Sequence, residues 1–367
     1  MDLTELARLA TPGSSTSDGG VVGRPSCEIT LFVSPRDGVV ALVDGDNWRW
    51  AHTTLDTAGF EKSGDGNRAI PLTDLDRTRE VLLTLDVVAR ITQTKITPSC
   101  ETYIGDFARD LIDHLPGQWS VEVESYAMRV WQGDLAACMW SPSMAATLKQ
   151  RRVRWAAVLR REDGAELAVI RDPKRDLYHV GALHPGNLHP DELVAPPASV
   201  TVQPTPSSAA GQINSRLLPA YARAVLHCQV NSLKEDLDRV RQTHESGAVP
   251  EPAPKKLLDA YHRFTTTAPK VTTAVRALAA LNERQAAVLQ RVEDMIAAGL
   301  GAATETTAAR CTDQVAWWLT EGGDSLIEVA RRSVPNSDPP ATETDRPTAS
   351  PHAVPPATSR SAPGPRR

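Results

Sequence analysis

Positively charged side chains are concentrated in the middle of this chain. Six of them fall between residues 149 and 161, and three more follow by residue 175. If residues 153–159 form a strand, Arg152, Arg154 and Arg160 share one face of it, because side chains alternate along a strand. Such a positive strip could bind phosphate groups, RNA or an acidic protein surface. The candidate binding residues are Arg152, Arg154, Arg160, Arg171, Lys174 and Arg175.

Acidic residues lie close enough to this strip to neutralise it. They are Glu162, Asp163, Glu166, Asp172 and Asp176. An ordinary solvated face is therefore the alternative interpretation. The whole chain has a net charge of −5, which is not the strongly basic balance typical of a protein whose main task is to bind a phosphate backbone.

Two carboxylates form a second candidate group. Glu122 and Glu124 lie in the alternating segment 119–126, so they project from the same strand face about 7 Å apart. A pair at this spacing could carry out acid–base chemistry or hold a metal ion. An exposed strand face would have the same pattern without any function.

Histidines and short acidic loops offer weaker signals. His179, His184 and His189 precede Asp191 and Glu192, and such groups can bind zinc or transfer protons. The segment 183–190 is rich in turn-forming residues, however, and a chain exit is a poor support for a catalytic geometry. The Asp44-Gly45-Asp46-Asn47 segment resembles the start of a metal loop, but it fits a helix N-terminus better because tryptophans follow where further ligands are needed.

Sequence motifs for common enzyme classes are missing. The chain has no P-loop, no GxGxxG after a strand, no GxSxG, no HExxH and no paired CxxC. Its five cysteines are widely spaced and odd in number, which favours small buried side chains in a reducing compartment over disulfides or a zinc site. No cofactor or metal ion is predicted.

Composition and length indicate a soluble protein with more than one domain. The 367 residues are 41% hydrophobic and 23% charged. No run reaches the roughly 20 apolar residues that span a bilayer, and the first residues lack the basic start of a secretion signal. A cytoplasmic protein without a membrane segment is the expectation.

Residues 26–194 are predicted to form an α+β domain. Two β-branched runs flank Asp37-Gly38 and predict a hairpin, while helices are expected over 47–58 and from Thr73 onward. Strands at 153–159, 166–170 and 177–183 read as an antiparallel meander.

Residues 213–332 are predicted to be helical. A heptad-like seam steps by four and three residues, as in a coiled coil, and two adjacent tryptophans near the end fit an interaction surface. The residues of this candidate association site are Leu226, Val230, Leu233, Leu237, Val240, Trp317 and Trp318.

The remaining segments are predicted to be disordered. They are 1–25, a Pro/Ser-rich linker over 195–212 and a Pro-rich tail over 333–367. The pattern favours a non-enzymatic cytoplasmic interaction or scaffold protein, with a partner-binding α+β domain and a helical module that self-associates or docks on a protein partner. Nucleic-acid binding through the arginine-rich meander is one alternative. An enzyme of unrecognised type using Glu122 and Glu124, or His179 and His184, is the other.

Overall fold

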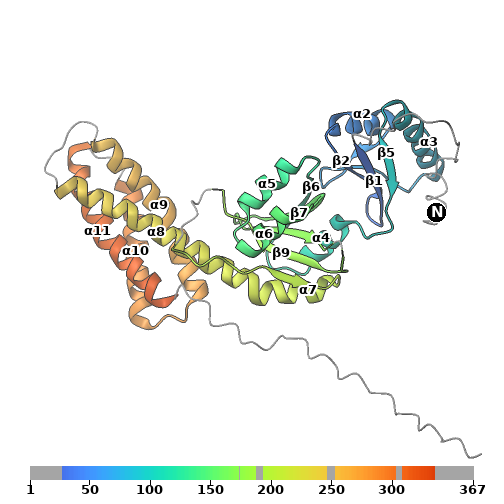
Figure 1. Ribbon diagram of the computed structural model, residues 1–367. Coiled ribbons are helices and arrows are strands. Elements are labelled where there is room, and N and C mark those ends of the chain that lie inside the picture. Colours follow the sequence, from blue (N-terminus) through green and yellow to red (C-terminus); the bar gives the residue numbers. More distant parts are fainter. Residues whose placement is uncertain (1–26, 173, 187–192, 246–252, 303–307, 335–367) are drawn as a thin grey trace, which may run out of the picture. The chain divides into compact units, whose positions relative to one another are not determined.

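A computed structural model describes residues 27–172, 174–186, 193–245, 253–302 and 308–334. The part up to residue 202 contains two five-stranded sheets with helices on their faces, and the part from residue 218 onward is helical (Figure 1). The prediction of an α+β part followed by an all-α part is therefore confirmed. The predicted disordered ends, 1–25 and 333–367, lie outside the described residues except for 333 and 334.

The first sheet is built around the predicted hairpin. Its strand order is β3-β4-β2-β1-β5, with β5 parallel to β1 and all other pairs antiparallel. Gly38 lies at the hairpin turn with φ of +85°, where a Cβ atom would overlap the carbonyl oxygen of Ile70. Only glycine fits this turn. The strands are β1 (Glu28–Ser34), β2 (Gly38–Asp44), β3 (Glu61–Lys62), β4 (Arg68–Ile70) and β5 (Lys95–Pro98).

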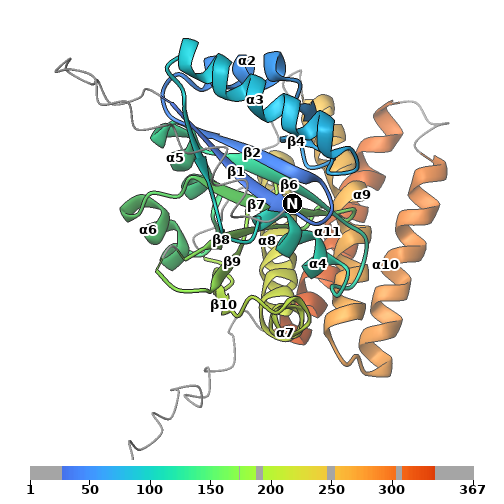
Figure 2. The ribbon, with the colours of Figure 1, turned by 90° about the vertical axis from the view of Figure 1, so that its right-hand side faces the viewer.

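Two helices, α2 (Trp48–Ala58) and α3 (Leu75–Ile91), lie side by side next to the first sheet (Figure 2). They bury Leu55, Val81, Leu82 and Leu85 in one cluster with the apolar side chains of β1 and β2. The N-cap of α3 is Asp74, whose carboxylate accepts a hydrogen bond from the Arg77 backbone at 3.0 Å. The N-cap thus lies one residue later than Thr73 and the helix begins at Leu75, because the Asp74 carboxylate caps the first turn well.

The second sheet is an antiparallel meander with the order β10-β9-β8-β7-β6. The predicted meander is present, but its first strand begins at Trp155 and not at Val153. Arg152 and Arg154 therefore precede the strand. The strands are β6 (Trp119–Ser125), β7 (Trp155–Arg161), β8 (Glu166–Arg171), β9 (Tyr178–Ala182) and β10 (Val200–Val202).

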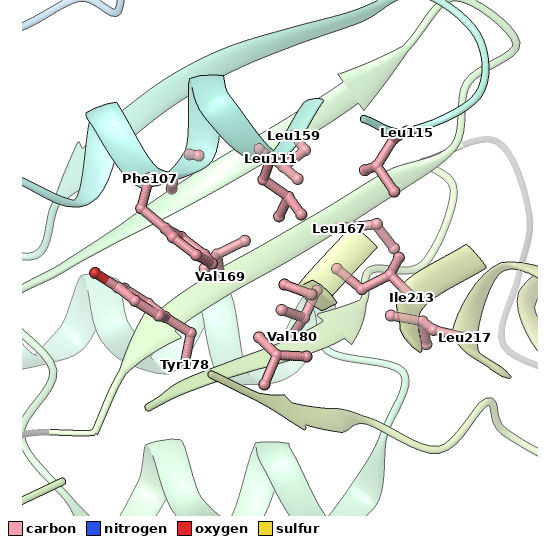
Figure 3. Packing of buried hydrophobic residues seen from close by; sticks show 14 of the residues in the cluster. Phe107, Leu111, Leu115, Leu159, Leu167, Val169, Tyr178, Val180, Ile213 and Leu217 are labelled. Carbon is pink, nitrogen blue, oxygen red and sulfur yellow. The ribbon is translucent and has the colours of Figure 1, made fainter. Parts of the chain in front are cut away.

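Each face of the second sheet has its own apolar cluster. On one face, α4 (Ile104–Ile112) packs Phe107 and Leu111 against the sheet, together with Ile213 and Leu217 (Figure 3). On the other face, α5 (Arg129–Cys138) and α6 (Pro142–Gln150) cover the middle of β7 and β8. Side-chain alternation along the strands produces this division.

Residues 195–212, which the composition predicts as a linker, contain regular structure. They include β10, which pairs with β9, and α7 (Pro206–Gln212), whose Ala209 and Ala210 are buried. A five-residue π-helical turn, η1 (Ile213–Leu217), connects α7 to the next helix. The difference has a physical reason: the small and β-branched residues among the prolines and serines pack against the sheet, and overall composition does not reveal this.

Four helices form the last part of the chain. They are α8 (Leu218–Glu245), α9 (Ala253–Leu278), α10 (Glu283–Ala302) and α11 (Ala308–Ser333). Buried side chains from all four helices, from Leu226 onward, form one cluster, while the first turns of α8 pack into the core of the second sheet. Helix α9 passes through Pro269, although a proline within a helix usually kinks or ends it. The break lies instead before α10, where Asn282 and Gln285 exchange side-chain hydrogen bonds with each other's backbone N–H groups.

Candidate binding pocket

A pocket of about 570 Å³ opens on the second sheet, on the face that also packs against α5 and α6. Glu122 and Glu124 of β6 lie on this face, as the alternation in the sequence predicts. The antiparallel register places Arg160 of β7 directly opposite Glu166 of β8. Tyr126 and Trp131 contribute aromatic surface at the start of α5. We call these six residues the acidic pocket.

Arg160 lies among three carboxylates. Its Nη1 donates to Glu122 Oε2, its Nη2 lies 3.5 Å from Glu124 Oε1, and its Nε lies 3.3 Å from Glu166 Oε1. Burial alone would lower the pKa of Arg160, but these carboxylates outweigh it and the pKa is raised. The guanidinium is therefore permanently charged and held in place.

Glu124 uses both of its carboxylate oxygens within the chain. The Tyr126 hydroxyl donates to Oε2 at 2.9 Å, while Oε1 contacts Arg160. Burial, followed by the neighbouring Glu124 charge, raises the pKa of Tyr126 well above its ordinary value. Tyr126 therefore stays protonated and acts as a donor.

Glu122 and Glu166 each retain one unengaged oxygen. Among the described residues, no side chain donates to Glu122 Oε1 or to Glu166 Oε2. With Asp134 also lining the pocket, carboxylates outnumber the single guanidinium. The pocket therefore has an excess of negative charge and open acceptor atoms.

Of the two predicted histidines that the structure describes, one lines this pocket. His184 does, where burial lowers its pKa and its ring lies 4.6 Å from that of Trp140. His179 instead contacts Thr201 at 2.9 Å and Asp172 at 3.5 Å. His189, Asp191 and Glu192 lie outside the described residues. The predicted histidine cluster is therefore not brought together at this pocket.

The predicted positive strip is divided among separate ion pairs. Arg152 donates to Asp44 at 2.6 Å and to the Ala127 carbonyl at 3.0 Å, while Arg154 contacts Glu28 at 3.4 Å and Asp44 at 3.2 Å. These two arginines therefore face strands of the first sheet, whereas Arg160 lies in the acidic pocket. The single face expected for the three does not form, because two of them precede β7.

The remaining cations of the strip lie near the β8–β9 connection. Arg171 contacts Glu101 and Asp176, each at 3.1 Å. Lys174 and Arg175 have exposed side chains. Of the six candidate cations, four are thus paired with carboxylates of the same chain.

The helical association residues are buried within the chain. Leu226, Val230, Leu233 and Leu237 are at most 1% exposed and share a cluster with residues of α9, α10 and α11. These four residues of the predicted seam therefore pack on helices of the same chain. The side chains of Val240, Trp317 and Trp318 lie outside the described residues.

A buried polar network lies next to the pocket and has little signal in the sequence. Asp65, which lies in a turn before Gly66, accepts hydrogen bonds at 2.6 Å from Tyr103 Oη and from Arg109 Nη2. Arg109 also binds Asp37 in the hairpin turn of the first sheet. Burial would raise the pKa of Asp65, but hydrogen bonds from Ser63 and Tyr103 and the charge of Arg109 hold it below its ordinary value.

Two cysteines differ from the expectation of burial. Cys27 and Cys228 are buried, but Cys100 and Cys138 are exposed, and Cys138 lines the pocket. Within the described residues, no three His, Cys, Asp or Glu side chains are grouped so that they could hold a metal ion. Across the same residues, no helix combines the length and apolar character needed to cross a membrane.

Comparison with known proteins adds no relative to these observations. Neither the protein-family models, nor the curated proteins, nor the solved structures contain a match to this chain.

Proposed function

We propose that this chain is a non-enzymatic interaction protein and that its α+β part binds a positively charged group of a protein partner in the acidic pocket. The observation that carries the proposal is the pair of unengaged oxygens, Glu122 Oε1 and Glu166 Oε2, on either side of Arg160. A ligand cation that reaches both would form two charge-assisted hydrogen bonds.

The setting of these carboxylates supports binding. They are attached to hydrogen-bonded strands, so little conformational entropy is lost when a ligand is held. Trp131, which is partly exposed and lines the pocket, adds aromatic surface, which attracts lysine and arginine side chains through the ring face. An arginine side chain, which is flat and carries several donors, suits this combination best.

The ion pairs favour this proposal over nucleic-acid binding. Arg152, Arg154, Arg160 and Arg171 already contact carboxylates of the same chain, so their charges are balanced locally. Lys174 and Arg175 alone make a small patch for a phosphate backbone.

Calorimetric titration of the full chain with a tri-arginine peptide tests the proposal. We expect saturable binding that weakens with salt, and a dissociation constant raised at least about tenfold in the Glu122→Gln, Glu166→Gln double variant. These changes keep the side-chain shape and remove the charge.

The matched control is Glu162→Gln, which removes one exposed carboxylate that does not line the pocket. It should bind the peptide as the unchanged protein does, and a tri-glutamate peptide should not bind. Equal binding by the double variant, or no binding by the unchanged protein, would rule out the acidic pocket as the site.

A further inference from the structure

Helix α3 presents an apolar stripe that the fold does not use. Leu83, Val87 and Ile91 are 52%, 57% and 76% exposed. Their spacing of four residues places them on one side of the helix. Three of the seven exposed large apolar side chains among the described residues thus lie in one row, and isolated surface residues do not have this pattern.

The opposite side of α3 packs into the apolar core of the first sheet. Thr78, Val81, Leu82, Leu85 and Ala89 are buried there. Trp50 of α2, which is 61% exposed, lies one helical turn from Thr54, and Thr54 contacts Thr92 at the end of α3 at 3.0 Å. Figure 2 shows α2 and α3 next to each other. Trp50 is thus a further exposed apolar side chain on the neighbouring helix.

Charged residues of both signs flank this stripe, and two exposed ones of opposite sign lie near its ends. Glu80 lies on the N-terminal side of Leu83, and Arg90 lies between Val87 and Ile91. Both are exposed, and Arg90 contacts only Asp86 of its own helix, at 2.6 Å. In a two-fold antiparallel pair of identical helices, the residue numbers of every facing pair add to the same total. If Leu83 faces Val87, Glu80 therefore faces Arg90.

We propose that the α3 stripe is a docking surface for a second copy of this chain, which binds through a two-fold antiparallel α3–α3 contact. In this register each Leu83 packs on Val87 of the other copy, and each Glu80 pairs with Arg90. Arg79 faces Ile91, where its methylene chain covers the apolar side chain. One helix row is a small interface, so the dimer forms reversibly and depends on concentration.

Sedimentation velocity of the full chain over a range of concentrations measures this equilibrium. We expect the unchanged protein to convert from monomer to dimer, and Val87→Asp to raise the dimer dissociation constant at least about a hundredfold, because it places two carboxylates in the apolar contact. Val87 is exposed, so the variant folds, which its circular dichroism spectrum checks. Val130→Asp on α5, at a residue of similar exposure, is the matched control and should dimerise normally.

Charge reversal tests the register directly. Glu80→Arg and Arg90→Glu should each weaken the dimer about tenfold, because like charges then face each other, and the two together should restore it. A protein that is monomeric at every concentration would overturn the proposal. A dimer that Val87→Asp does not weaken, or a double variant as weak as the single ones, would also overturn it.

Discussion

At the scale of single residues, the pair of Asp65 and Arg109 differs from the many ion pairs on the surface. The Asp65 side chain is 1% exposed and that of Arg109 is 15% exposed, whereas Arg77 and Glu61 are both more than 60% exposed. Exposed pairs contribute at most about 1 kcal/mol, but the loss of one partner from a buried pair costs about 3–5 kcal/mol. The buried pair should therefore contribute more to stability than the exposed pairs. Because Arg109 of α4 also binds Asp37, the pair connects α4 with the hairpin of the first sheet.

Replacement of Asp65 by asparagine should lower the free energy of unfolding by about 3 kcal/mol, because Arg109 would lose its most buried carboxylate. Urea denaturation measures the change. Glu61→Gln removes a carboxylate from an exposed pair and serves as the control, with little change expected. If both variants were equally stable, the buried network would not be a main source of stability.

The same variant has a defined pH dependence. The pKa of Asp65 is lowered in the folded protein, so its contribution to stability is complete above the unfolded value of 3.8 and is lost as the pH falls through the folded pKa. The stability difference between the two proteins should therefore be constant at neutral pH and shrink below pH 3.8. Asp106, whose pKa burial raises, is present in both proteins and contacts the same Arg109 at 3.8 Å.

Sequence patterns identify individual residues of the acidic pocket, but they do not predict that these residues lie together. Alternation along residues 119–126 places Glu122 and Glu124 on one face, and this is how they lie. Arg160 stands out as part of a cationic run. Their meeting depends on the pairing of β6 with β7 across about 35 residues, and local periodicity carries no information on that register.

At the scale of elements, local sequence patterns predict sharp turns correctly, but they do not predict elements whose limits depend on tertiary packing. The hairpin around Asp37-Gly38 follows from its turn residues. The passage of α9 through Pro269 does not, because a proline within a helix costs about 3 kcal/mol. Burial of Phe264, Val271 and Val275, each worth about 1.5–3 kcal/mol, outweighs this cost.

Gly38→Ala should destabilise the first sheet by at least about 2 kcal/mol, because both the positive φ and the close approach of Ile70 exclude a Cβ atom. Thermal unfolding followed by circular dichroism measures the effect. Gly164→Ala separates the two causes, since Gly164 has φ of +88° but no atom within 4 Å of the place where an alanine Cβ would lie. A similar loss in both variants would show that the contact with Ile70 adds nothing.

At the scale of the whole molecule, composition gives a misleading division of the chain. The segment 195–212 has the residues of a linker, yet β10 and α7 form within it. Ten of the 31 buried residues in the cluster beneath α4 come from residues 200–228. They include Ile213 and Leu217, and Tyr221 of α8, so the α+β core draws on residues beyond the predicted domain end.

A fragment that ends at residue 194 should therefore fail to fold, although a division by composition would cut there. It loses Val200, Ile213, Leu217 and other buried side chains whose combined burial exceeds the usual net stability of a domain, about 5–15 kcal/mol. A fragment ending at residue 230 keeps these residues. Soluble yield and near-ultraviolet circular dichroism compare the two, and a well-folded shorter fragment would contradict the expectation.

The late position of these core residues also matters during synthesis. The strands β6 to β9 leave the ribosome before α7 and α8, and their face towards α4 is incomplete until residues 200–228 follow. At about 5–20 residues per second, this interval lasts a few seconds. The nascent chain thus carries an apolar sheet face that α4 covers only in part for that time, and this is the stage at which chaperones would have most to protect.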